Sequence, residues 1–317
     1  MSIKIFLMNF LIIVVAILSL RKIVLRFKPK GIYLKKENKE IAKVGGIVLL
    51  LSILIFWRFF NPYLFLSLIF IFLLGFIDDL KELKVWQKFL GELIIALIFM
   101  LTSGTTTEII FFPKSINFII TLIWILGITN AFNLLDIQDG LATGVGFLVS
   151  LAFLYLAHFT KNLLAEQISL LLSSSLLGIL IFNFPPAKIY LGDSGSLSLG
   201  YLFSILAISL SYAQASHEMA IFSPVFILGF PIFDTIFVSL RRLSKGKSIF
   251  KKSDDHFILC LIKSGKKDKA LFICYFLSLL FILLGILFTR LNNVFSLILI
   301  ILFLNLLYRI SSKLSEG

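Results

Sequence analysis

Six aspartates of this 317-residue chain stand in short polar segments beside long apolar runs. They are Asp78, Asp79, Asp136, Asp139, Asp193 and Asp234. Placing a charged side chain inside a bilayer costs about 2.5–3.5 kcal/mol on insertion scales, so such residues are usually functional. If these carboxylates meet on one side of a membrane, they could bind a hard cation and act on phosphate groups.

The segment 130–140 carries the strongest local signal. Asn130, Asn133, Asp136 and Asp139 follow one another at intervals of three residues, so a helix would place them on one stripe. Their oxygen atoms, with no Lys or Arg between them, suit Mg²⁺ or Mn²⁺ better than zinc, which prefers nitrogen and sulfur ligands. A solvated turn between two membrane spans is the alternative.

Asp78 and Asp79 end an apolar run, and Lys88 and Glu92 enter the next run at helical spacing. Adjacent carboxylates push their pKa values apart, which allows one to act as a base and the other as a metal ligand. The alternative is that the pair merely ends a helix at the lipid headgroups.

Two further segments are candidates. Asp193 lies in a short glycine-rich loop, Gly192-Asp-Ser-Gly-Ser196, whose backbone N–H groups could approach a phosphate while the carboxylate reaches a cation. The segment 241–269 contains ten Lys and Arg residues around His256. It could be only a basic membrane anchor, and a single histidine is more often a surface residue.

The composition excludes a soluble domain. Hydrophobic residues make up 59% of the chain, which includes 35 Phe, and the mean hydropathy is +1.03, whereas soluble domains are about 45–50% apolar. We expect one all-α, polytopic membrane domain over residues 1–317. Cys260 and Cys274 are expected to be free thiols.

Apolar runs of membrane-spanning length predict about 10–11 transmembrane helices. The expected spans are 3–20, 44–60, 62–77, 86–101, 116–129, 140–159, 168–184, 197–214, 219–240, 270–288 and 293–310.

The basic residues indicate the orientation. With the N-terminus outside, the segments expected inside carry 25 of the 30 Lys and Arg residues, as the positive-inside rule requires. The segments with Asp78, Asp136 and Asp193 then all face the cytoplasm from the inner (plasma) membrane. The net charge of +13 is therefore assigned to this bias and to contact with membrane lipids, and no nucleic-acid partner is expected.

Taken together, the motifs resemble those of the bacterial polyprenyl-phosphate N-acetylhexosamine-1-phosphate transferases, glycosyltransferase family 4. The resemblance covers about residues 44–270. It rests on Val44-Gly-Gly46, Gly75-Phe-Ile-Asp-Asp79 with Lys88, Asn130 through Ala142, Gly192 through Ser196, Pro231 to Asp234 with Arg241-Arg242, and Asp255-His-Phe257. The Tyr-Xaa-Lys usual after the aspartate pair in phospho-N-acetylmuramoyl-pentapeptide transferase is absent, so the GlcNAc-1-phosphate branch looks closer.

The resemblance implies transfer of a sugar 1-phosphate from a UDP-activated amino sugar to undecaprenyl phosphate, with Mg²⁺ (or Mn²⁺) and release of UMP. The implied catalytic residues are Asp78, Asp79, Asp136 and Asp139, the last two lining the nucleotide–sugar site. The implied substrate-binding residues are Lys88, Asn133, Arg241 and His256, and the implied metal ligands are Asp193 and Asn130. A homodimer is compatible with the sequence but not required by it.

The sequence departs from the family pattern at two places. Ile137 and Gln138 replace the first glycine and its neighbour in the usual Asp-Gly-Xaa-Asp-Gly, and Leu259 and Cys260 stand where His and Arg are typical. The second departure predicts a weaker grip on the donor diphosphate.

Two other classes of protein fit the sequence less well. A cation-coupled transporter would spread its acids through the depth of the spans and show inverted repeats, whereas these acids gather at one face and no repeat is visible. A non-catalytic membrane scaffold would not need four acidic motifs in one compartment.

Overall fold

The computed structural model describes residues 2–36, 39–109, 112–210, 218–247, 254–302 and 305. The chain divides into two compact units, Met1–Leu210 and Ser211–Gly317. The single domain expected over residues 1–317 stays a prediction.

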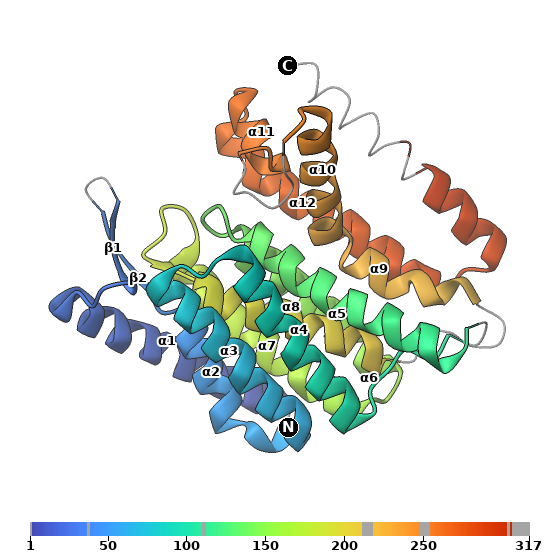
Figure 1. The fold of residues 1–317 in the computed structure, drawn as a ribbon, viewed down its shortest axis with the longest axis horizontal. Coiled ribbons are helices and arrows are strands. Elements are labelled where there is room, and N and C mark those ends of the chain that lie inside the picture. The colour runs from blue at the N-terminus through green and yellow to red at the C-terminus, as the bar shows by residue number, and fades with distance from the viewer. Residues whose placement is uncertain are drawn as a thin grey trace. The chain divides into compact units, whose positions relative to one another are not determined.

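The first unit is a helix bundle with one small sheet (Figure 1). Its elements are α1 (Ser2–Phe27), β1 (Tyr33–Lys36), β2 (Lys39–Lys43), α2 (Gly45–Ile55), η1 (Trp57–Phe59), α3 (Pro62–Lys81), α4 (Val85–Ser103), α5 (Lys114–Leu135), α6 (Leu141–Phe159), α7 (Leu163–Asn183), β3 (Ile189–Tyr190) and α8 (Gly192–Ser209).

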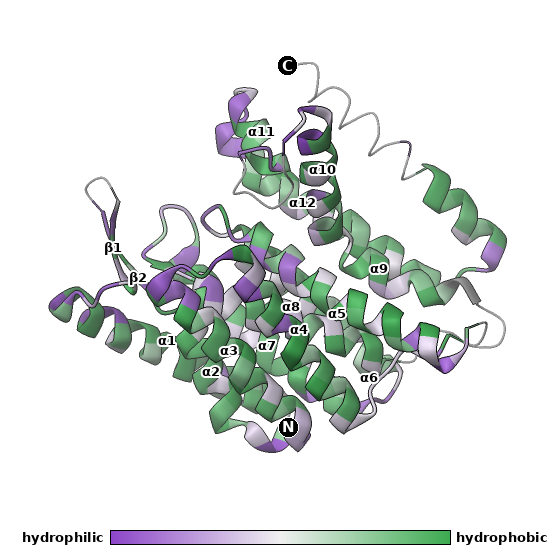
Figure 2. Ribbon diagram, viewed as in Figure 1, coloured by the Kyte–Doolittle hydropathy of each residue, from purple (hydrophilic) through white to green (hydrophobic). Residues whose placement is uncertain are grey.

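The expected all-α membrane class is confirmed. Among the described residues, seven helices are long and apolar enough to cross a membrane, or eight if one bent pair forms a single span. Figure 2 shows apolar residues along these helices, while hydrophilic residues of the first unit concentrate around β1, β2 and nearby helix ends. The orientation of the N-terminus stays a prediction.

Every one of the eleven predicted spans contains helix, but not all are full crossings. α2 has only 11 residues, and the last predicted span is described as helix over Asn293–Leu302. α8 is buried along almost its whole length and packs against α3 and α5. Its small residues, such as Ser194, Ser198 and Gly200, suit contact with other helices rather than with lipid, so its apolar signal is weak.

A three-stranded sheet was not expected from the sequence. β1 pairs antiparallel with β2, and β2 pairs parallel with β3 through Ala42–Ile189 and Lys43–Tyr190. This pairing fixes the segment after α1 against the segment that precedes Asp193.

The second unit is helical wherever its elements are defined. It contains η2 (Glu218–Phe222), α9 (Ser223–Ile227), α10 (Gly229–Ser244), α11 (Phe257–Lys263), α12 (Lys267–Phe288) and the helix Asn293–Leu302. The predicted span 219–240 is not straight, because the chain bends by 68° between Ile227 and Gly229. Pro231 lacks the N–H that a continuous helix would direct to the Ile227 carbonyl, which explains the break.

Candidate active site

Asp79 is an anchor for the glycine-rich loop. Its carboxylate is 7% exposed and accepts hydrogen bonds from the backbone N–H groups of Asp193 (2.9 Å) and Ser194 (3.0 Å). It also accepts from the Ser194 hydroxyl at 2.8 Å, and Lys43 Nζ lies 3.4 Å away. The carboxylate binds the free N–H groups at the start of α8, where the helix dipole favours negative charge.

Close backbone packing makes this anchor geometrically possible. Gly192 has φ of +76°, and a Cβ there would lie only 2.9 Å from Asp79 Oδ2. A Cβ on Gly75, one turn before Asp79 in α3, would lie 2.6 Å from the Asp193 carbonyl oxygen. The two glycines therefore let α3 and the start of α8 come into direct contact.

Lys88 is the centre of a polar cluster drawn from four helices. Its Nζ donates to Asp78 Oδ2 at 2.8 Å, to Asn133 Oδ1 at 3.2 Å and to Asp193 Oδ1 at 2.5 Å. These partners come from α3, α5 and α8, while Lys88 belongs to α4. The structure thus brings Lys88 together with three other residues predicted from the sequence, which surround its positive charge.

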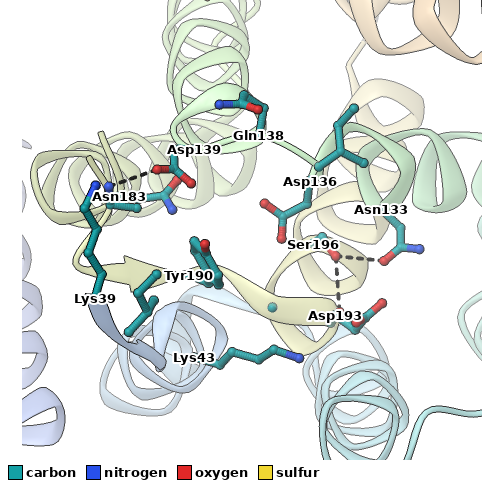
Figure 3. A pocket seen from close by; sticks show the side chains of 14 residues that line it. Lys39, Lys43, Asn133, Asp136, Gln138, Asp139, Asn183, Tyr190, Asp193 and Ser196 are labelled. Atoms are coloured by element: carbon teal, nitrogen blue, oxygen red, sulfur yellow. Dashed lines mark hydrogen bonds between the residues drawn. The ribbon is translucent and has the colours of Figure 1, made fainter. Parts of the chain in front are cut away.

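A pocket of about 420 Å³ opens beside this cluster (Figure 3). It is lined by Lys39, Ile41, Lys43, Asn133, Asp136, Ile137, Gln138, Asp139, Asn183, Ala187, Tyr190, Gly192, Asp193 and Ser196. Asp139 accepts a hydrogen bond from the Ala187 N–H at 3.0 Å, and Ser196 donates to Asn133 Oδ1 at 2.9 Å. Asp136 and Asp139 therefore lie in the same pocket as Asp193. The predicted helical stripe is wrong beyond Asn133, because α5 ends at Leu135 and the two aspartates stand in the turn that follows.

The pocket is electrostatically crowded. Burial, followed by the nearby carboxylates of Asp193 and Asp79, raises the pKa of Asp136 to about 7. Burial and the charges of Asp139 and Asp136 also raise the pKa of Tyr190. A cation bound here would relieve this repulsion, because an opposite charge favours the ionised form of a carboxyl group.

Several residues of the pocket were not predicted. Lys39 and Lys43 come from β2, and the buried Asn183 comes from the end of α7. Asn183 accepts from the Gly140 N–H and the Thr143 hydroxyl and donates to the Ile189 carbonyl. Lys39, Ile41 and Lys43 stand two residues apart, so a strand places them on one face. The segment Lys-Glu-Ile-Ala-Lys has no alternation of polar and apolar residues that could have predicted the strand.

Asn130 lies outside the residues that line the pocket. Its Nδ2 donates to Glu92 Oε2 in α4 and to the Leu126 carbonyl oxygen at 3.0 Å. Its predicted role as a metal ligand stays a prediction, and the structure gives it a different partner, a buried carboxyl group.

The second unit contains a smaller polar site. His256, which the alternative explanation placed on the surface, is 2% exposed. Its Nδ1 lies 2.8 Å from Asp234 Oδ2, and Asp234 Oδ1 accepts from the Phe257 N–H at 2.9 Å. Arg241 Nε is 3.8 Å from Asp255 Oδ1, which also pairs with Lys245 at 2.6 Å. Asp234 thus fixes the imidazole in place among basic residues.

In the described part of the chain, no three His, Cys, Asp or Glu side chains form a ready metal site. The oxygens of Asp78, Asn133 and Asp193 nevertheless surround one cation, the Lys88 ammonium. Oxygen donors of this kind fit Mg²⁺ or Mn²⁺. A metal ion that used these same oxygen atoms would compete with Lys88 for them.

Comparison with known proteins identifies the family. Residues 61–211 match the model of glycosyl transferase family 4. The chain is 32% identical over 252 residues to the undecaprenyl-phosphate alpha-N-acetylglucosaminyl 1-phosphate transferase of Thermotoga maritima, covering 80% of this chain and 78% of that protein. The chain belongs to glycosyl transferase family 4, as its motifs predicted, and is a multi-pass membrane transferase.

Two other relatives represent the two branches of the family considered in the sequence analysis, one each. A probable undecaprenyl-phosphate N-acetylglucosaminyl 1-phosphate transferase of Bacillus subtilis is 28% identical over 301 residues, covering 89% of this chain and 84% of the relative. A phospho-N-acetylmuramoyl-pentapeptide-transferase of Staphylococcus carnosus is 31% identical over 246 residues, covering 67% of this chain and 74% of the relative.

Proposed function

We propose that this protein transfers N-acetylhexosamine 1-phosphate from a UDP-sugar to undecaprenyl phosphate, at the cytoplasmic face of the inner (plasma) membrane, with release of UMP. The observation that carries the proposal is the gathering of Asp78, Lys88, Asn133 and Asp193 beside an acidic pocket. The names of two relatives, both undecaprenyl-phosphate N-acetylglucosaminyl 1-phosphate transferases, support the lipid acceptor.

The residues of the Lys88 cluster and of the adjacent pocket suit the chemistry of two phosphate-bearing substrates. Lys88 can hold a phosphate oxygen, and Asp78, at a helix end where a lipid headgroup would lie, is the proposed group that acts on the lipid phosphate. Asp79 is bonded to the start of α8, so we assign it the role of holding Asp193 and Ser194 in place. Asp136 and Asp139 would orient the nucleotide–sugar.

We further propose a divalent cation, Mg²⁺ or Mn²⁺, held mainly by Asp193 with oxygens of Asp78 and Asn133 nearby. Such an ion would neutralise phosphate charge and the charge that develops on the leaving group. The basic segment and His256 of the second unit are proposed to bind the donor diphosphate, since charge-assisted hydrogen bonds to phosphate need such side chains.

One assay tests the whole proposal. The purified protein would be incubated in lipid nanodiscs with undecaprenyl phosphate and a panel of UDP-sugars, and UMP release would be followed with Mg²⁺ and with EDTA. We expect Mg²⁺-dependent UMP release with at least one UDP-N-acetylhexosamine. No UMP from any donor, or full release in EDTA, would contradict the transfer reaction or its metal dependence, respectively.

A further inference from the structure

Glu92 is a buried carboxyl group for which the proposed reaction has no role. It lies in the membrane-spanning helix α4 and is 1% exposed. Its Oε2 accepts from Asn130 Nδ2, whereas its Oε1 has no hydrogen-bond partner among the residues that the structure describes. A buried polar atom without a partner is costly, so it calls for an explanation.

Glu92 stands one helical turn after Lys88. Residues at i and i+4 are neighbours on a helix surface, and a long side chain points back over the preceding turn. The Glu92 carboxyl is also close enough to interact electrostatically with Lys88, Asp78 and Asp193. The Glu92 carboxyl, with Oε1 available, therefore lies near Lys88.

Lys88 occupies the oxygen atoms that a bound divalent cation would need. Its ammonium uses its three N–H bonds on Asp78, Asn133 and Asp193, the same oxygens that a divalent cation would take. A divalent cation on the Asp193 carboxylate would compete with the Lys88 ammonium for Oδ1, and two cations this close repel one another, most strongly at low dielectric. The N–H bond that Lys88 then withdraws from Asp193 needs another acceptor.

We propose that Glu92 is a positioning residue that accepts the Lys88 ammonium when a divalent cation takes the Asp193 carboxylate. Asn130 holds the Glu92 carboxyl through Oε2 and leaves Oε1 available. Lys88 would thus have two alternative acceptors: the oxygens of the cluster beside the start of α8, and the Glu92 carboxyl one turn further along α4. This inference rests on the proposed metal dependence.

The test measures Mn²⁺ binding without either substrate, by electron paramagnetic resonance of the full chain in nanodiscs. Wild type, Glu92→Gln, Lys88→Met and the double variant form a cycle that isolates the coupling between the two residues. We expect Glu92→Gln to raise the Mn²⁺ Kd about tenfold, because Lys88 then stays on Asp193. Lys88→Met should lower the Kd, and adding Glu92→Gln to it should change the Kd less than twofold.

Three outcomes would overturn the inference. A Kd within twofold of wild type in Glu92→Gln would show that Glu92 does not affect the cation. An equal tenfold loss in the Lys88→Met background would show that Glu92 acts on the cation directly and not through Lys88. No Mn²⁺ binding by wild type would instead refute the proposed metal site, and the inference with it.

Two further variants guard against a purely structural effect. Ser169→Ala removes another fully buried side chain, whose oxygen has no hydrogen-bond partner in the described part of the chain, and it should leave the Mn²⁺ Kd unchanged. Glu92→Asp keeps the charge but retracts it by one methylene, so it should raise the Kd by severalfold. It replaces Glu92→Gln in the cycle if that variant does not fold.

Discussion

The two compact units use aspartate in opposite ways. In the first unit, Asp78 and Asp193 contact the partly buried Lys88, and Asp136 and Asp139 line the adjacent pocket with Lys39 and Lys43 at its strand side. In the second unit, Asp234 meets one imidazole and one backbone N–H and has no second carboxylate among its recorded hydrogen-bond partners. The first arrangement concentrates negative charge, whereas in the second the carboxylate is hydrogen-bonded through both of its oxygens.

The difference indicates a division of tasks. A surplus of carboxylates stabilises a bound cation and becomes more acidic when one arrives. A carboxylate that is fully hydrogen-bonded to histidine fixes the ring and its tautomer instead. We therefore expect substitutions in the first unit to affect turnover most, and substitutions at the Asp234–His256 pair to affect donor affinity.

The largest effect is expected at the aspartate pair. Asp78→Ala should abolish turnover, by at least about 1,000-fold, while the protein stays folded. Asp79→Ala should also abolish it but should in addition lower the free energy of unfolding by about 3–5 kcal/mol, because it leaves buried N–H groups at α8 and Lys43 unpaired. Activity assays and denaturant unfolding measure the two quantities. Turnover within tenfold of wild type, about 1.4 kcal/mol in barrier, would place the chemistry elsewhere.

Asp193→Asn should lower activity at least about 100-fold, the scale of losing one charge-stabilising group. The asparagine keeps the size of the side chain but cannot offer a charged ligand. The matched control is Asp268→Asn in the exposed first turn of α12, which should keep wild-type kinetics. Steady-state kinetics over a range of Mg²⁺ concentrations would check both, and near wild-type turnover in Asp193→Asn would rule out the assignment.

His256→Ala should raise the KM for the donor about tenfold, with a lower kcat only if the contact strengthens in the transition state. Asp234→Asn should act in the same direction, because it loosens the ring. The control is His158→Ala, a largely exposed histidine paired with Glu166. Unchanged donor kinetics in His256→Ala would leave the basic segment as a membrane anchor only.

The smallest effect is a pH dependence through Asp136. Its pKa of about 7 means that the group is mostly protonated below pH 7 and charged above it, so activity at low Mg²⁺ should rise severalfold between pH 6 and 8. The raised pKa also means that the contribution to stability is present below the unfolded value of about 4 and is lost as pH rises through 7. Asp136→Asn should flatten both profiles, and an unchanged rise would assign it to another group.

The sequence predicted the positions of the helices, because apolar length is a local signal. The alternation of the predicted spans placed the segments of Asp78, Asp136 and Asp193 on one side, but not their contacts with Lys88. The sequence could not predict the parallel pairing of β2 with β3, which depends on residues almost 150 positions apart. It also missed Asn183, whose partners lie on other elements. It named Glu92 for its helical spacing from Lys88 but gave no sign of its partner Asn130. The bend before Gly229 had a signal in Pro231, but an apolar run conceals a break of this kind.

That long-range strand pair has a consequence for how the protein is made. β2 leaves the ribosome roughly 7–30 s before β3, at ordinary rates of about 5–20 residues per second. During this interval the edge of the hairpin that β3 will later cover has no partner, and exposed strand edges attract other chains. Lys39 and Lys43 discourage such pairing with their charge, so the residues that line the pocket in the finished protein would first protect a nascent edge.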